Sequence, residues 1–148
     1  MEKLTAILII EVLGKPADYI KKALQDILEK LRTEKDVTLT HNLIHEPKEL
    51  ENGVFTTFAE IELETNLASL LNIVFSYMPS HIEVISPENL NLKNTALNSF
   101  LNEATRKLHQ YDELARAMLM EKEVAKQPEV ANFVPVASKK KMKKKKKR

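Results

Sequence analysis

The first 86 residues divide into four strand-like and two helix-like segments, in the order β-α-β-β-α-β. The first strand-like segment, residues 4–13, is rich in Ile, Leu and Val and stops at Gly14. A run this apolar predicts a central strand that is buried on both faces. The last strand-like segment, residues 81–85, lies between Pro79 and Pro87. Because proline cannot donate to a β-ladder, this bracketing predicts an edge strand.

The two helix-like segments have the spacing of amphipathic helices. The first begins at Pro16, which costs nothing in the first turn of a helix because its missing N–H would have no partner there. The second begins at Asn66, a residue type that caps helix N-termini, and ends before Pro79. We expect one apolar stripe of each helix to pack on a sheet. The stripe of the first helix is Ile20, Leu24, Ile27, Leu28 and Leu31, and that of the second is Leu67, Leu70, Leu71, Val74 and Met78.

The two middle strands alternate between apolar and polar residues. One predicted face of residues 37–44 holds Val37, Leu39, His41 and Leu43. In residues 54–64 one face holds Ala59, Ile61 and Leu63, and the other holds Glu60, Glu62 and Glu64. Asn52 and Gly53 precede the second of these strands, and both residue types tolerate positive φ. The pair therefore predicts the turn of a hairpin.

This order of segments is typical of the ferredoxin-like fold, an α+β architecture with an antiparallel sheet and both crossover helices on one face. We expect that domain to occupy residues 1–88. A third helix is predicted, capped near Asn94 or Thr95 and running to about Lys126, and its residues 95–125 would span about 46 Å if straight. Because this exceeds the width of so small a sheet, residues 89–126 are expected to pack on the sheet or on a partner chain. Residues 127–148 are expected to form a flexible linker and a disordered, lysine-rich tail.

Charge is divided sharply along the chain. Residues 139–148 hold nine of the 23 Lys and Arg residues and no acidic residue, whereas residues 1–138 hold 14 basic and 21 acidic residues, a net charge of −7. A basic arm on an acidic body is typical of an interaction segment. Such a tail can neutralise phosphates and release counterions, which predicts salt-dependent and non-specific binding of nucleic acid, with RNA favoured. The residues expected to bind are Lys139, Lys140, Lys141, Lys143, Lys144, Lys145, Lys146, Lys147 and Arg148.

The same charges fit other uses. They would attract anionic lipid or serve as a targeting signal, and they would also solubilise the chain or contact its own acidic body weakly. The leading hypothesis is a small, non-enzymatic binding module, in which the tail holds nucleic acid and the acidic body makes protein contacts. We expect a cytoplasmic protein, because neither a transmembrane segment nor a signal peptide is visible.

Apolar residues outside the predicted core mark two candidate interfaces. The sheet face opposite the helices receives Ile7, Ile9 and Phe58 beside Glu60 and Glu62. With a single aromatic among carboxylates, that face lacks the pattern of a base-stacking RNA surface. In the third helix, apolar residues recur alternately every four and three positions, which is heptad spacing. Packing within the chain and homo-oligomerisation, for example as a homodimer, both stay open. The residues of the candidate interface are Ile7, Ile9, Phe58, Leu97, Leu101, Leu108, Tyr111 and Met118.

The sequence contains no pattern that points to an enzyme, a metal or a cofactor. It has no cysteine, which excludes disulfides. Its two glycines, Gly14 and Gly53, are too few and too far apart for a phosphate-binding glycine loop. His41 and His45 would lie about 13 Å apart on a strand, too far to share a metal. The row Glu60, Glu62 and Glu64 has neither a nucleophile nor a base beside it, so we interpret it as a solvated face.

The junction Gly14-Lys15-Pro16 resembles the strand-Gly-Pro-helix entry of ACT-type regulatory domains. The resemblance covers residues 4–86 in topology but only Gly14 and Pro16 in residue type. Lys15 separates two residues that are usually adjacent in that family, and the long third helix is foreign to it. The resemblance implies the alternative function, a ligand-sensing or oligomerising regulatory domain that binds an amino acid between paired sheets. Backbone N–H groups at the start of the first helix would then receive the carboxylate.

Overall fold

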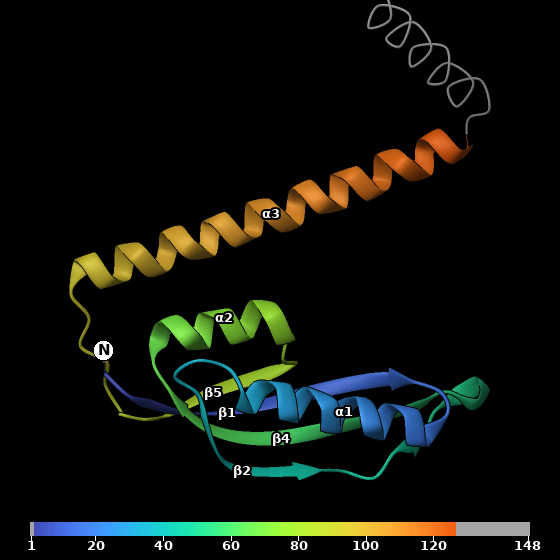
Figure 1. Cartoon of the computed structure of the whole chain (residues 1–148), viewed down its shortest axis with the longest axis horizontal. Helices are drawn as coiled ribbons and strands as arrows, with labels where there is room; N and C mark the ends of the chain where they lie inside the picture. The colour runs from blue at the N-terminus through green and yellow to red at the C-terminus, as the bar shows by residue number, and fades with distance from the viewer. Residues whose placement is uncertain (1, 127–148) are drawn as a thin grey trace, which may run out of the picture. The chain divides into compact units, whose positions relative to one another are not determined.

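A computed structural model describes residues 2–126 and shows an α+β fold (Figure 1). The strands are β1 (Leu4–Gly14), β2 (Thr38–Ile44), β3 (Lys48–Glu49), β4 (Phe55–Thr65) and β5 (His81–Ser86). The helices are α1 (Ala17–Arg32), α2 (Leu67–Tyr77) and α3 (Asn94–Lys126), with one 3₁₀ turn, η1 (Glu51–Gly53). The chain forms two compact units, residues 1–102 and 103–148, whose boundary falls inside α3. The domain limits expected from the sequence stay a prediction, and the expected tail lies outside the described residues.

The sheet has the strand order β2-β4-β1-β5, and all of these pairs are antiparallel. The short β3 pairs with the beginning of β4. The predicted β-α-β-β-α-β topology is therefore confirmed, with β1 and β4 in the centre. Among residues 2–126, β5 pairs with β1 alone, so the strand that Pro79 and Pro87 bracket lies at the edge of the described sheet.

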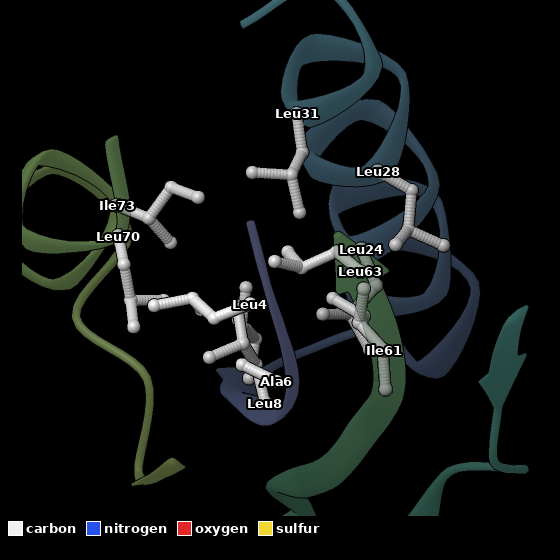
Figure 2. Packing of buried hydrophobic residues seen from close by; sticks show 12 residues of the cluster. Leu4, Ala6, Leu8, Leu24, Leu28, Leu31, Ile61, Leu63, Leu70 and Ile73 are labelled. Atoms are coloured by element: carbon white, nitrogen blue, oxygen red, sulfur yellow. The ribbon is translucent and has the colours of Figure 1, made fainter. Parts of the chain in front are cut away.

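Both crossover helices cover the same face of the sheet (Figure 1). One hydrophobic cluster joins Leu24, Leu28 and Leu31 of α1 with Leu70 and Ile73 of α2. Figure 2 shows these side chains pointing toward those of the central strands. The residues that the central strands contribute to this cluster are Leu4, Ala6, Leu8, Ile10, Ala59, Ile61 and Leu63. This cluster therefore lies between the two crossover helices and one face of the sheet.

The central strands alternate as their sequences predict, but β1 is not fully buried on both faces. Leu8 and Ile10 are buried, whereas Ile7 and Ile9, which point to the opposite face, are only half-buried. On β4 the carboxylates predicted to share a face do so, with Glu60 exposed between buried Ala59 and Ile61 residues. The apolar run of β1 therefore reflects one buried face and one half-buried face.

β2 departs from the predicted alternation because it contains a bulge. The pairing register with β4 shifts between Leu39 and His41, so that Leu39 and His41 point to opposite faces. Leu39 and Ile44 pack on the core, while Leu43 is 49% exposed. The prediction that Leu39, His41 and Leu43 share a face is therefore wrong. An extra residue in one strand inverts the alternation beyond it, and period-2 reasoning cannot detect this.

The buried face of α2 also differs in part from the prediction. Leu70 and Leu71 are buried as expected, and Ile73 is buried as well, but Met78 is 66% exposed. Met78 follows the helix as its C-cap with a positive φ of 46°. Ser69, Asn72 and Ser76 form one polar stripe, and the remaining apolar side of α2 is wide. The sequence therefore indicates the solvent side but not which part of the apolar side packs most closely on the sheet. In α1, by contrast, the predicted stripe is buried or half-buried throughout.

Candidate interaction surfaces

The sheet face opposite α1 and α2 carries three of the predicted interface residues. Ile7 and Ile9 of β1 and Phe58 of β4 lie there, all half-buried. The register of the sheet places carboxylates around them. Ile7 lies between Glu62 on β4 and Glu83 on β5, and Ile9 lies between Glu60 and His81. The face is thus a short apolar strip bordered by acidic side chains.

His45 belongs to this face, although no sequence pattern assigns it a role. Its ring stacks on Phe58 with a centroid separation of 4.1 Å and an interplanar angle of 22°. Its Nε2 atom is buried without a hydrogen-bond partner among the described residues and lies 3.5 Å from Oε2 of Glu60. One sequence signal could have predicted this position. His41, Leu43 and His45 are each two residues apart, so in an extended strand they lie on the same face. The stacked imidazole covers Phe58, so this aromatic ring does not offer a free platform.

Side-chain hydrogen bonds of Thr56 and Thr57 link β4 to the neighbouring segments at one end of this face. The Thr56 hydroxyl donates to Oε1 of Glu11 at 3.2 Å, and the buried Thr57 hydroxyl donates to the carbonyl of His45 at 2.5 Å. The backbone N–H of His45 donates to the carbonyl of Phe58 at 3.0 Å. These bonds extend the pairing of β2 and β4 by one residue and hold His45 over the Phe58 ring.

The remaining predicted interface residues lie on α3, of which no residue is buried. All five are exposed: Leu97, Leu101, Leu108, Tyr111 and Met118. Exposed apolar side chains that the heptad prediction omitted are Leu114, Leu119, Met120 and Val124. The apolar surface of α3 is therefore wider than the predicted stripe.

Two ion pairs lie on the polar side of α3. Arg106 donates to both carboxylate oxygens of Glu103, one of them from Nε at 2.9 Å. This hydrogen bond is the main reason that the pKa of Glu103 is lowered and that of Arg106 is raised. Arg116 Nε lies 3.0 Å from Oδ2 of Asp112 one turn earlier. Pairs at these spacings add modestly to the stability of an exposed helix.

The junction that resembles ACT-type domains has a local explanation. A Cβ atom at Gly14 would lie 3.1 Å from Cγ2 of Ile20, so the glycine allows α1 to approach the end of β1 closely. Pro16 was predicted to lie in the first turn of the helix, but it is the N-cap of α1, which begins at Ala17. Its carbonyl accepts a hydrogen bond from the N–H of Tyr19 at 3.1 Å. Both residues are therefore accounted for by packing and capping without a ligand.

A polar cavity lies where β4 meets α2. Its lining includes Lys3, Asp36, Glu64, Thr65 and Asn66. The buried Thr65 hydroxyl has no hydrogen-bond partner among the described residues, while Lys3 Nζ lies 3.8 Å from Oε2 of Glu64. Two carboxylates against one ammonium group make the cavity a poor receptor for the carboxylate of an amino acid.

Residues 2–126 contain no cluster of three or more His, Asp or Glu side chains placed to hold a metal ion. None of the helices in this range combines the length and the apolarity needed to cross a bilayer. The tail residues Lys139–Arg148, predicted to bind nucleic acid, lie outside the part of the chain that the structure describes.

Comparison with known proteins identifies a relationship over most of the chain. The model of the MJ0538 family matches residues 5–132, which include the sheet except for its first residue, Leu4, together with both crossover helices and α3. The chain belongs to the MJ0538 family. The match ends before Lys139, so membership of the MJ0538 family rests on the folded residues and not on the lysine run. A search of curated proteins gives no match.

Proposed function

We propose that this protein is a non-enzymatic binding module in which residues 139–148 bind RNA without sequence specificity and the folded residues make protein contacts. The observation that carries the proposal is the separation of charge. Nine cations lie in the last ten residues, and the preceding 138 residues have a net charge of −7. A polyanion is attracted to one end of the chain and repelled by the rest.

The sheet face supports the proposal that the folded residues contact protein and not RNA. Four-stranded sheets that bind RNA stack bases on free aromatic rings beside basic side chains. Here His45 covers Phe58, and Glu60, Glu62 and Glu83 border the apolar strip. Such a face suits a protein surface that supplies apolar and basic groups, and it disfavours a phosphate backbone.

The tail proposal makes a quantitative prediction about salt. If all nine cations contact phosphates of single-stranded RNA, the logarithm of the association constant falls with the logarithm of salt concentration with a slope of about −6. Raising salt from 50 to 200 mM then weakens binding by roughly 10³- to 10⁴-fold. Fewer engaged cations give a proportionally smaller slope.

Fluorescence anisotropy with a labelled single-stranded RNA tests the proposal on three proteins. The full chain should bind with the steep salt dependence above, and the chain ending at residue 138 should lose binding. A variant with Lys143–Lys147 changed to Gln should show a slope reduced by about half. The matched control changes five exposed lysines of the body to Gln: Lys15, Lys22, Lys35, Lys48 and Lys93.

The control lowers the net charge by the same amount but leaves the tail intact, so its slope should stay close to that of the full chain. If both variants lost RNA affinity equally, the net charge of the protein and not the tail would determine binding. Undiminished RNA binding by the chain ending at residue 138 would overturn the proposal. So would preference for vesicles containing anionic lipid when these compete with RNA for the tail.

A further inference from the structure

We propose that α3 pairs with α3 of a second copy of this chain as a parallel, in-register, two-stranded coiled coil. The inference rests on the apolar seam of the helix and on the charges that flank it. It does not depend on the tail or on RNA binding. The second copy is favoured over other partners because the helix is complementary to itself in charge.

The seam consists of heptad positions a and d, which face the partner helix in a coiled coil. Positions a are Leu101, Leu108, Ala115 and Lys122, and positions d are Leu97, Ala104, Tyr111, Met118 and Ala125. None of these residues is buried within the part of the chain that the structure describes. Seven consecutive seam positions, from Leu97 to Met118, are apolar or aromatic, and this gives three heptads of contact.

The flanking positions e and g decide which partner and which orientation fit. In a parallel pair, a g residue of one helix faces the e residue five positions later in the other. This rule matches Lys107 with Asp112, Leu114 with Leu119, and Glu121 with Lys126 of the second copy. Two contacts are between opposite charges and one is apolar, and each occurs twice by symmetry. No like charges face each other along these rows.

In antiparallel pairing g residues face g residues and e residues face e residues. Lys107 can then meet Glu121, but in that register Asp112 of one copy meets Asp112 of the other, so like charges face each other. The match of Lys107 with Asp112 then cannot form. The ion pair of Asp112 with Arg116 within one chain is exposed, so forming a contact between chains costs little. Lys122, at one a position, weakens the end of the seam but favours two strands over larger bundles, as single polar a residues do.

A parallel pair brings the two Lys126 residues to the same end, so both chains continue toward their tails from one place. If the tail binds RNA as proposed, two tails with nine cations each act at high effective concentration on one RNA. This consequence, unlike the pairing itself, rests on the proposed function.

Sedimentation equilibrium of the full chain without RNA tests the pairing. The expected species is a dimer of about 34 kDa, twice the 17.0 kDa of the chain. Two methionines provide a matched pair of variants, because Met118 is a seam residue and 56% exposed, whereas Met120 lies outside the seam and is 66% exposed. Met118→Glu should raise the dissociation constant at least tenfold, and Met120→Glu should change it less than twofold.

Disulfide formation tests the orientation, and the native chain offers a clean background because it has no cysteine. Ala115→Cys places one thiol at an a position, where parallel in-register helices bring both copies together. Oxidation should therefore give a covalent dimer rapidly. Ala117→Cys, two residues away and off the seam, should stay largely monomeric on a denaturing gel.

Charge exchange tests the flanking contacts. Lys107→Glu and Asp112→Lys should each weaken self-association several-fold, because each creates two like-charge contacts in its own dimer. Mixing the two variants should give a heterodimer that restores the affinity of the native chain. A full chain that sediments as a monomer at all concentrations would overturn the pairing. Equal crosslinking at both cysteine positions, or no preference for the heterodimer, would overturn the parallel arrangement.

Discussion

Tyr77 shows at the scale of a single residue how burial and one hydrogen bond set an acid–base property. Its hydroxyl donates to Oε1 of Glu34 at 2.6 Å, and Lys30 Nζ lies 5.9 Å from the ring centre. Partial burial, then the hydrogen bond to Glu34 and the negative charge of that residue, raise the pKa of Tyr77 far above its usual range. The folded state therefore holds the neutral phenol, which ties the end of α2 to the segment that follows α1.

Replacing Tyr77 by Phe should lower the free energy of unfolding by about 1–2 kcal/mol at pH 7, because a hydrogen bond to a carboxylate is lost. The raised pKa means that the contribution is complete below pH 10 and declines above it, since the unfolded tyrosine then loses a proton that the folded one keeps. Urea denaturation at pH 7 to 11 should show the difference from the native chain shrinking above pH 10.

The control for this experiment is Tyr19→Phe, because Tyr19 is 68% exposed on α1. That variant should follow the native chain at every pH. A difference between Tyr77→Phe and the native chain that stays constant up to pH 11 would contradict the assigned cause.

The turn before β4 is also a matter of single residues. Asn52 and Gly53 adopt φ values of 65° and 71°, in the left-handed region that these two residue types tolerate best. This conformation was predicted from two letters of sequence, because it depends on the local backbone and on nothing distant.

At the scale of elements, the ends of helices were predicted better than their buried faces. Asn66 caps α2 as expected, and its side chain accepts from the N–H of Ser69 at 2.9 Å. α2 ends at Tyr77, before Pro79, as predicted. Capping and termination depend on a few neighbouring residues, whereas the part of the wide apolar side of α2 that packs most closely depends on the sheet that it meets.

Asn66→Ala should destabilise the folded chain by about 1 kcal/mol, because the N–H of Ser69 loses its acceptor. Asn66→Ser should retain most of the stability, since serine caps helices nearly as well. The free energy of unfolding from urea titration measures both. Equal losses for the two variants would show that Asn66 acts through something other than its cap.

At the scale of the whole molecule, one core on one sheet face supports the fold. β1 contributes to it at alternate positions, so two leucines of the same strand have very different surroundings. Leu8 is 0% exposed among the residues of Figure 2, whereas Leu13 is 66% exposed.

Leu8→Ala should lower the free energy of unfolding by about 3–4 kcal/mol, because it removes buried methyl groups and leaves a cavity in a close-packed cluster. Leu13→Ala should cost less than about 0.5 kcal/mol, as substitutions at exposed sites do. Chemical denaturation of both variants measures the contrast. A similar cost at the two positions would contradict the assignment of a core to a single face.

Sequence alone determined the order of the elements, the central and edge strands, the cap at Asn66 and the division of charge, because each of these depends on composition or on residues close in the chain. The tertiary structure decided which face of α2 is buried, where β2 bulges and that His45 stacks on Phe58. These features arise from contacts between segments far apart in sequence, and periodicity within one segment carries no information about them. The sequence predicted Ile7 and Ile9 beside Glu60 and Glu62, and only the register of the folded sheet added Glu83 of β5 as a neighbour of Ile7.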